Sequence, residues 1–196
     1  MSRLAIFIDG NYLMRAAEPV NIDYEKLPKE ILGHIDRRTS EPVDLLRTCF
    51  YDCLPWQNSD LTGDGAREQA RRFQRKTAFF NLLESFPRYS VRQGVLKPRG
   101  RERGKPRFEQ KRVDVLLALD LATLSFKNQI GHAAVITGDN DFVPAIETAR
   151  AEGVLVWLFH EEGQHTSNEL MQAADERIEI DRDFLHRVSR KKLNVR

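Results

Sequence analysis

The sequence has few cysteines. Only Cys49 and Cys53 occur among its 196 residues, inside an apolar stretch whose alternation predicts a strand. Two cysteines four apart on one strand point to the same face but lie too far apart for an easy disulfide. We therefore expect two reduced thiols in the core. With no C-x-x-C pair and five scattered histidines, the pattern argues against a structural zinc site.

Long apolar runs and secretion signals are also missing. No apolar run approaches the roughly 18 residues needed to span a bilayer, and the N-terminus lacks the layout of a signal peptide. A soluble, cytoplasmic protein without membrane contact is therefore expected. The length and the 41% of hydrophobic residues suit one domain. We predict a single domain over residues 1–189 and a short basic tail over residues 190–196.

Short, continuously apolar runs alternate with helical patterns along the chain. Strands buried on both faces and separated by helices predict a parallel sheet that is covered on both faces. The predicted fold class is therefore α/β, doubly wound, with a mainly parallel sheet. The run at 154–159 could also cover the edge of a homodimer, although a buried strand explains it better. Strands are predicted at 4–8, 43–51, 89–96, 133–137, 154–159 and 178–180, and helices at 22–35, 66–86, 113–124, 142–151, 167–174 and 183–188.

Positive charge is concentrated in one segment, residues 97–112. Eight Lys or Arg stand there against two Glu, a local charge of +6, and subtracting this from the net charge of +2 leaves −4 for the rest. Its glycines and prolines predict a mobile basic loop inserted into the domain. Such a loop favours a polyanionic partner, and a solvated insertion that binds nothing is the alternative. The candidate substrate-binding residues of this segment are Arg99, Arg101, Arg103, Lys105, Arg107, Lys111 and Arg112.

A second basic stripe lies on the predicted helix at 66–86. Arg67, Arg71, Arg72 and Arg75 recur there at helical spacing. They could add to a nucleic-acid surface, but a solvated helix face explains them better.

Aspartates follow two of the predicted strands. Asp9 comes directly after the run at 4–8, and Asp139 and Asp141 follow the run at 133–137. Ligands of open parallel sheets bind at the carboxyl ends of the strands, so these carboxylates converge if the two strands are neighbours. Clustered carboxylates repel one another unless a cation intervenes. Oxygen ligands suit Mg²⁺ or Mn²⁺, and such an ion can activate water against a phosphodiester.

Further polar residues could complete this site. Asp114 and Asp120 lie on the helix that follows the basic segment, and their spacing of six places them roughly 120° apart. Asp114 is therefore favoured as an ion ligand, and Asp120 remains a candidate. Asn11 could orient a metal-bound water or only cap a helix. Thr137 could touch a phosphate or only end a strand.

Structural roles alone could explain each of these aspartates. Asp9 with Gly10 could form only a turn, Asp139 and Asp141 could form only a helix cap, and Asp114 could lie on a solvated helix face. These interpretations weaken jointly, because all the acids that follow strands fall on one side of the predicted sheet.

Three blocks of sequence carry most of these residues: residues 6–12 (Ile-Phe-Ile-Asp-Gly-Asn-Tyr), residues 111–114 (Lys-Arg-Val-Asp) with Asp120, and residues 135–142 (Val-Ile-Thr-Gly-Asp-Asn-Asp-Phe). Together they resemble the NYN domain family, and more narrowly its LabA-like bacterial branch, within the PIN-like nuclease superfamily. They follow the family's order, and the resemblance runs from about residue 3 to about residue 181. The basic segment before Lys111 is longer than is usual for the family.

This resemblance implies a PIN-like sheet, a divalent-ion site and endoribonuclease activity. Asp9, Asp114, Asp139 and Asp141 match the metal-binding acids, Asp120 matches a further acidic position, and Asn11 matches the polar partner of the first aspartate. Single-stranded or structured RNA, such as tRNA, is then the expected substrate. The alternatives are a non-catalytic RNA-binding or regulatory module and a phosphatase or nucleotide hydrolase with the same acids.

Overall fold

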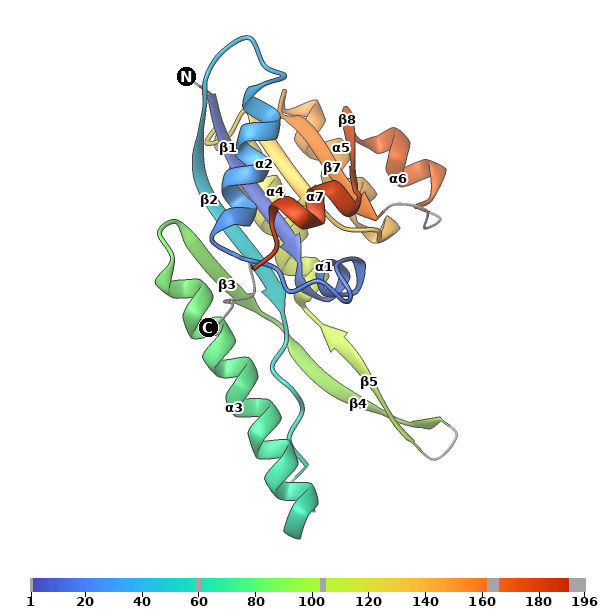
Figure 1. Ribbon diagram of the computed structural model, residues 1–196. Coiled ribbons are helices and arrows are strands. Elements are labelled where there is room, and N and C mark those ends of the chain that lie inside the picture. The colour runs from blue at the N-terminus through green and yellow to red at the C-terminus, as the bar shows by residue number, and fades with distance from the viewer. Residues whose placement is uncertain (1, 59–60, 103–104, 162–165, 191–196) are drawn as a thin grey trace, which may run out of the picture.

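Six parallel strands form the central sheet of the protein (Figure 1). The structure, a computed structural model, describes residues 2–58, 61–102, 105–161 and 166–190. Along the sheet the order is β3-β2-β1-β6-β7-β8. The predicted doubly wound α/β fold is confirmed. The strands are β1 (Ser2–Asp9), β2 (Val43–Asp52), β3 (Tyr89–Gln93), β6 (His132–Ile136), β7 (Leu155–Glu161) and β8 (Glu176–Ile180).

Helices cover both faces of this sheet, which explains why its strands are apolar on both sides. In β1, Leu4, Ile6 and Ile8 pack into one core, and Ala5 and Phe7 pack into the other. The first core is covered by α1 (Gly10–Ala16), α2 (Lys26–Asp36), α3 (Gly63–Ser85) and α7 (Arg182–Arg187). The second is covered by α4 (Val113–Phe126), α5 (Val143–Ala151) and α6 (Asn168–Ala173).

The strand order reverses between β1 and β6, in the middle of the sheet. These strands pair in parallel with Ile8 opposite Ile136, so Asp9 and Thr137 follow at the same level. The apolar run at 154–159 forms an inner strand, because β7 lies between β6 and β8 and residues 156–159 are buried. That run therefore provides no edge for a dimer, and the interpretation as a buried strand is confirmed.

The basic segment is a β-hairpin, and the expectation of a mobile loop is wrong for its described residues. β4 (Val95–Glu102) pairs antiparallel with β5 (Lys105–Lys111). Gly94 separates β4 from β3, where the sequence predicted one continuous strand. A Cβ at Gly94 would lie 2.5 Å from the Val113 side chain and 2.6 Å from the Lys111 carbonyl oxygen. Only glycine allows the two ends of the hairpin to approach this closely.

Helix α3 and the hairpin both project beyond the carboxyl ends of the strands (Figure 1). The segment after β2 joins them. Trp56 contacts Phe108 of the hairpin, with 5.5 Å between ring centroids. Gln69 of α3 accepts a hydrogen bond from the Asn58 backbone N–H at 2.8 Å and donates one to the Asn58 carbonyl at 3.2 Å. The two projections are therefore fastened to one connecting segment.

The cysteines and the starts of two helices can also be compared with the sequence-based predictions. Cys49 and Cys53 are buried free thiols, as predicted. The helix predicted from residue 22 begins at Lys26 and accommodates Pro28 in its first turn. The helix predicted from residue 142 begins at Val143, after the short 3-10 helix η1 (Asn140–Phe142). Within the described ranges, no helix is both long and apolar enough to cross a membrane.

Tyr12 joins two of the motif blocks. Its hydroxyl accepts a hydrogen bond from the backbone N–H of Glu161, at 2.7 Å. Its ring lies against Gly138, where an added Cβ would approach ring carbon Cε2 to 2.4 Å. Glycine at this position therefore lets the turn after β6 pack directly on α1.

We predict that Gly138→Ala destabilises the fold by about 1–3 kcal/mol, because the new methyl group must displace the Tyr12 ring. Urea unfolding followed by circular dichroism measures this change. Gly65→Ala is the matched control: its Cβ would meet only ordinary contact at 3.6 Å, and alanine favours the helix. Equal stability of Gly138→Ala and the unchanged chain would contradict the packing described for Tyr12.

Candidate functional site

Asp9 is the most buried carboxylate of the predicted site. It ends β1 and caps α1, accepting the backbone N–H of Tyr12 at 3.1 Å. Gly10 follows Asp9 and begins α1 against the Phe50 ring. A Cβ at this position would lie 2.4 Å from that ring, so only glycine fits. Burial is the largest influence on Asp9 and raises its pKa to about 6. Asn11 is exposed on the first turn of α1.

Asp139 and Asp141 lie in the turn after β6. Asp139 caps η1 by accepting the backbone N–H of Asp141 at 3.0 Å. The backbone N–H of Asp139 in turn donates to the Thr137 hydroxyl at 3.1 Å. Both aspartates are exposed, whereas Thr137 is fully buried. The Thr137 hydroxyl therefore holds the turn that carries Asp139, and a contact between Thr137 and a phosphate remains a prediction.

Asp114 connects these two groups of carboxylates. It lies in the first turn of α4, after Arg112, whose φ of 75° turns the chain from the hairpin into the helix. Partial burial raises the pKa of Asp114, and the charges of Asp139 and Asp141 raise it further. The charge of Asp114 likewise raises the pKa of Asp9. Four of the predicted acids thus lie within electrostatic reach of a neighbour in the group.

Asp120 lies apart from this group. It is six residues after Asp114, about 9 Å further along the helix axis. Arg92 of β3 binds both of its carboxylate oxygens at 2.8 Å, and the Tyr51 hydroxyl donates to it at 2.9 Å. Its charge is not among those that raise the pKa of Asp114. The structure therefore gives Asp120 a bidentate ion pair that joins α4 to β3.

Asp52 is a further carboxylate at this edge that the sequence analysis missed. It ends β2, next to β1, and is only 4% exposed. Lys76 of α3 pairs with it at 2.5 Å, and the charge of Asp52 contributes to the raised pKa of Asp9. The strand-end argument that singled out Asp9 applies equally to the predicted strand at 43–51. It would have indicated Asp52.

The donor chemistry of the group fits a hard divalent cation. All its ligands would be carboxylate oxygens, which suit Mg²⁺ or Mn²⁺. Asp9 and Asp114 have pKa values raised in part by neighbouring carboxylates, a repulsion that a cation relieves. Over the described ranges, no three His, Cys, Asp or Glu side chains are arranged to hold a metal ion. Mg²⁺ commonly takes one or two carboxylates and completes its shell with water and substrate phosphates.

The hairpin's basic side chains are only partly described. Arg99 and Lys111 both pair with Glu109, and these contacts lower the pKa of its carboxyl. Arg112 is exposed between the hairpin and α4. Two of the predicted phosphate-binding residues thus share one internal counter-ion. The side chains of Arg101, Arg103, Lys105 and Arg107 lie outside what the structure describes.

Comparison with known families shows which family these motifs belong to. The pattern of the NYN domain matches residues 3–181, which includes all three motif blocks. The chain belongs to the NYN domain family. This membership indicates the PIN-like nuclease superfamily, whose members are generally nucleases.

Two known proteins are similar to this chain, one in sequence and one in fold. This NYN protein is 26% identical over 192 residues to "Low amplitude and bright protein LabA" of Synechococcus elongatus, a match that covers 96% of this chain and 90% of LabA. A crystal structure of a protein of unknown function from Vibrio parahaemolyticus shares the fold with a TM-score of 0.57 and 17% identity. It covers 93% of this chain and 94% of the other.

The raised pKa of Asp9 makes stability depend on pH. Because its pKa rises from 3.8 to about 6 on folding, the folded state binds the proton more tightly. The free energy of unfolding therefore falls as pH rises from 3.8 to about 6, by up to about 3 kcal/mol. Asparagine keeps a good helix cap. We therefore predict that the free energy of unfolding of Asp9→Asn is about 1–3 kcal/mol higher than that of the unchanged chain at about pH 7.5 without divalent ions.

Urea unfolding of both proteins across this pH range tests the prediction. The difference between them should shrink towards pH 4, where the carboxyl is protonated in both states. Asp183→Asn, at an exposed first-turn position of α7, is the control for loss of one negative charge. A variant that is less stable than the unchanged chain at every pH would contradict the buried, unfavourable charge at Asp9.

Proposed function

We propose that this NYN domain is a metal-dependent endoribonuclease that hydrolyses RNA phosphodiester bonds with Mg²⁺ or Mn²⁺. The observation that carries the proposal is the position of Asp9, Asp114, Asp139 and Asp141 at the switch point of a parallel sheet, where α/β proteins bind ligands. Their electrostatic coupling supports it. Membership of a family related to nucleases supports the same reaction class.

The ion would take its carboxylate ligands from this group of four aspartates and complete its shell with water and substrate phosphates. Hydrogen bonds to the backbone keep two of the four in place. Asp9 is fixed by its bond to the backbone of α1, and Asp139 by its bonds within the turn after β6. Exposed Asn11 is placed to hydrogen-bond a water or phosphate near Asp9. When bound, the ion would activate water and neutralise charge on the phosphodiester. Asp120 is left out of the ligand set because Arg92 binds both its oxygens.

RNA is the proposed substrate, and the hairpin is proposed to bind its backbone. NYN domain proteins generally act on RNA, and β5 leads within two residues to the helix that carries Asp114. Basic side chains there would contact phosphates without reading sequence. The excess of positive charge in the hairpin, in a chain that is otherwise acidic, supports this role.

We predict that Asp139→Asn lowers the rate of RNA cleavage by at least about 100-fold, the upper end for partners of a metal ligand. The change removes a charge and keeps the shape, so fold and RNA affinity should be nearly unchanged. Cleavage of labelled tRNA and of unstructured RNA, with Mg²⁺, with Mn²⁺ and with chelator, measures this. Asp183→Asn serves again as the control and should cleave normally.

Two results would decide against this proposal. Unchanged turnover in Asp139→Asn would remove the metal-site assignment. Intact RNA in every reaction, with binding retained, would instead favour a non-catalytic RNA-binding module.

Shortening the hairpin should weaken RNA binding without abolishing the reaction. Pro98 and Phe108 are paired across the hairpin, so a two-residue Asn-Gly turn can replace residues 99–107. For single-stranded RNA, we predict weaker binding and a salt dependence shallower by about 0.7 for each phosphate that the shortened hairpin no longer neutralises. Fluorescence anisotropy at several salt concentrations measures both. A full-length hairpin with Gln at its basic positions separates charge from shape, and normal affinity in that variant would exclude the hairpin as a backbone clamp.

A further inference from the structure

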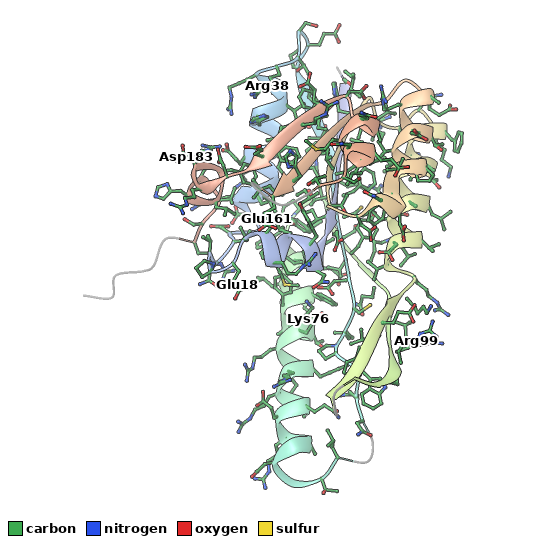
Figure 2. All side chains as sticks on the ribbon, turned by 90° about the vertical axis from the view of Figure 1, so that its right-hand side faces the viewer. Glu18, Arg38, Lys76, Arg99, Glu161 and Asp183 are labelled. Carbon is green, nitrogen blue, oxygen red and sulfur yellow. The ribbon has the colours of Figure 1, made fainter. Side chains whose placement is uncertain are left out.

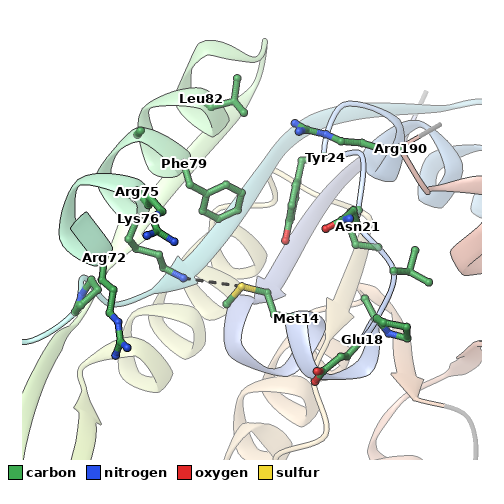
Figure 3. Close-up of a pocket in the computed structure, with 16 residues that line it drawn as sticks. Met14, Glu18, Asn21, Tyr24, Arg72, Arg75, Lys76, Phe79, Leu82 and Arg190 are labelled. Atoms are coloured by element: carbon green, nitrogen blue, oxygen red, sulfur yellow. Dashed lines mark hydrogen bonds between the residues drawn. The ribbon is translucent and has the colours of Figure 1, made fainter. Parts of the chain in front are cut away.

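A large groove lies between α3 and the segment that leads from α1 to α2 (Figure 3). Its volume is about 1360 Å³, above the range of about 300–1,000 Å³ that is typical of small-molecule pockets. The α3 wall from Arg72 to Leu82 extends about 15 Å. We call this the α1–α3 groove. Its size suits a segment of a polymer.

The lining of the α1–α3 groove combines positive charge with exposed apolar surface. Four of its residues are cationic, and Glu18 is the one acid among its lining residues. Met14 and Leu82, 38% and 40% exposed, are among the large apolar side chains that the described surface leaves accessible. Cationic and apolar groups in one groove match a chain that carries both phosphates and accessible bases. The cationic residues are Arg72, Arg75, Lys76 and Arg190.

An aromatic pair stands at the centre of the groove. Phe79 is partly exposed and contacts the buried Tyr24 ring edge-on, with 5.0 Å between centroids. Figure 3 shows both rings between the α3 wall and the opposite wall. The contact with Tyr24 holds Phe79 in one orientation. A base could pack on such a ring without hydrogen-bond readout.

Lys76 links the groove to the acidic site, because it lines the groove and pairs with a carboxylate at that edge of the sheet. Met14 lies on α1, the helix that Asp9 caps. Lys76 reaches from α3 to pair with Asp52, whose charge acts on Asp9. In Figure 2, Lys76 lies on the half of α3 that is nearer the sheet. A strand held at the acidic site could therefore continue past Lys76 towards Arg75 and Arg72.

We propose that the α1–α3 groove binds an unpaired stretch of the RNA strand next to the cleaved bond, with phosphates at Arg72 and Arg75 and a base on Phe79. This rests on the proposed function, since it takes RNA as the substrate. A duplex keeps its bases stacked inside and offers the apolar floor no partner. The groove thus selects RNA with a single-stranded flank.

Two charge variants of the same helix test this proposal. Arg72→Gln with Arg75→Gln removes two charges that line the groove, and Arg67→Gln with Arg71→Gln removes two that do not. All four arginines are exposed, and each variant removes one arginine that pairs with an acid of the same helix: Arg72 pairs with Glu68 at 3.0 Å, and Arg67 pairs with Asp64 at 3.6 Å. Both variants are made in the full chain carrying Asp139→Asn, so that RNA stays uncut. Fluorescence anisotropy measures binding of a labelled unstructured RNA and of the same strand paired with its complement.

The groove variant should bind single-stranded RNA about 10- to 30-fold more weakly at about 0.1 M salt, with a salt slope shallower by about 1.4. The control variant should stay within about twofold of the parent, and neither pair of changes should alter duplex binding by more than this. A 4-thiouridine-substituted strand should crosslink to peptides containing Phe79 or Met14. Equal weakening of RNA binding in the two variants, or crosslinks confined to the hairpin, would contradict the proposal that the α1–α3 groove binds RNA. The groove would then bind another partner.

Cleavage by chains that retain Asp139 is scored separately, so the two proposals can fail independently. If the protein cuts RNA in a metal-dependent reaction but the groove and control variants bind RNA equally well, the proposed RNA-binding role of the groove is wrong and the nuclease proposal stands. If only the groove variant binds RNA more weakly and no chain cuts RNA, the nuclease proposal is wrong and the groove remains an RNA-binding site.

Discussion

The parallel pairing of β1 with β6 determines where the candidate metal-binding carboxylates that follow these strands lie. It sets Asp9 and the turn after β6 at the same level of the sheet. The strand order reverses at this pair, so α1 and α5, which follow the two strands, pack on opposite faces, an arrangement that leaves a crevice at the strand ends of α/β proteins. Tyr12 reinforces the arrangement by packing on Gly138 and accepting the Glu161 N–H. Without this pairing, the carboxylates would be only separate turns and helix caps.

Bringing carboxylates together at a partly buried edge is electrostatically unfavourable. The structure offsets this in different ways for different residues. Asp52 has the Lys76 ammonium, and Asp120 has the Arg92 guanidinium. Asp9 has only backbone N–H groups to lower its pKa against burial and the charges of Asp114 and Asp52. The carboxylates that carry counter-ions thus have a structural role, and Asp9 and Asp114, whose pKa values stay raised, are among those proposed to bind a cation.

Beyond the acidic site, two projections form the second surface that is proposed to bind RNA. The hairpin and α3 are fastened to the same segment, through Trp56 and Asn58, so both hold a defined position beside the carboxylates. The proposed path of RNA uses them differently. The hairpin would bind phosphates next to Asp114, and the groove along α3 would supply apolar surface for bases.

The sequence by itself determined the α/β class, the strands and the positions of Asp9, Asp139 and Asp141, because apolar runs and turn residues are local signals. Tertiary structure decided the rest. Asp120 shares α4 with Asp114, but its partners Arg92 and Tyr51 come from β3 and β2, which are distant from it in the sequence. The basic segment has no apolar pattern, so its hairpin depends on cross-strand pairing. Arg72 and Arg75, which resemble a solvated helix face, line a groove only because the segment after α1 packs opposite them.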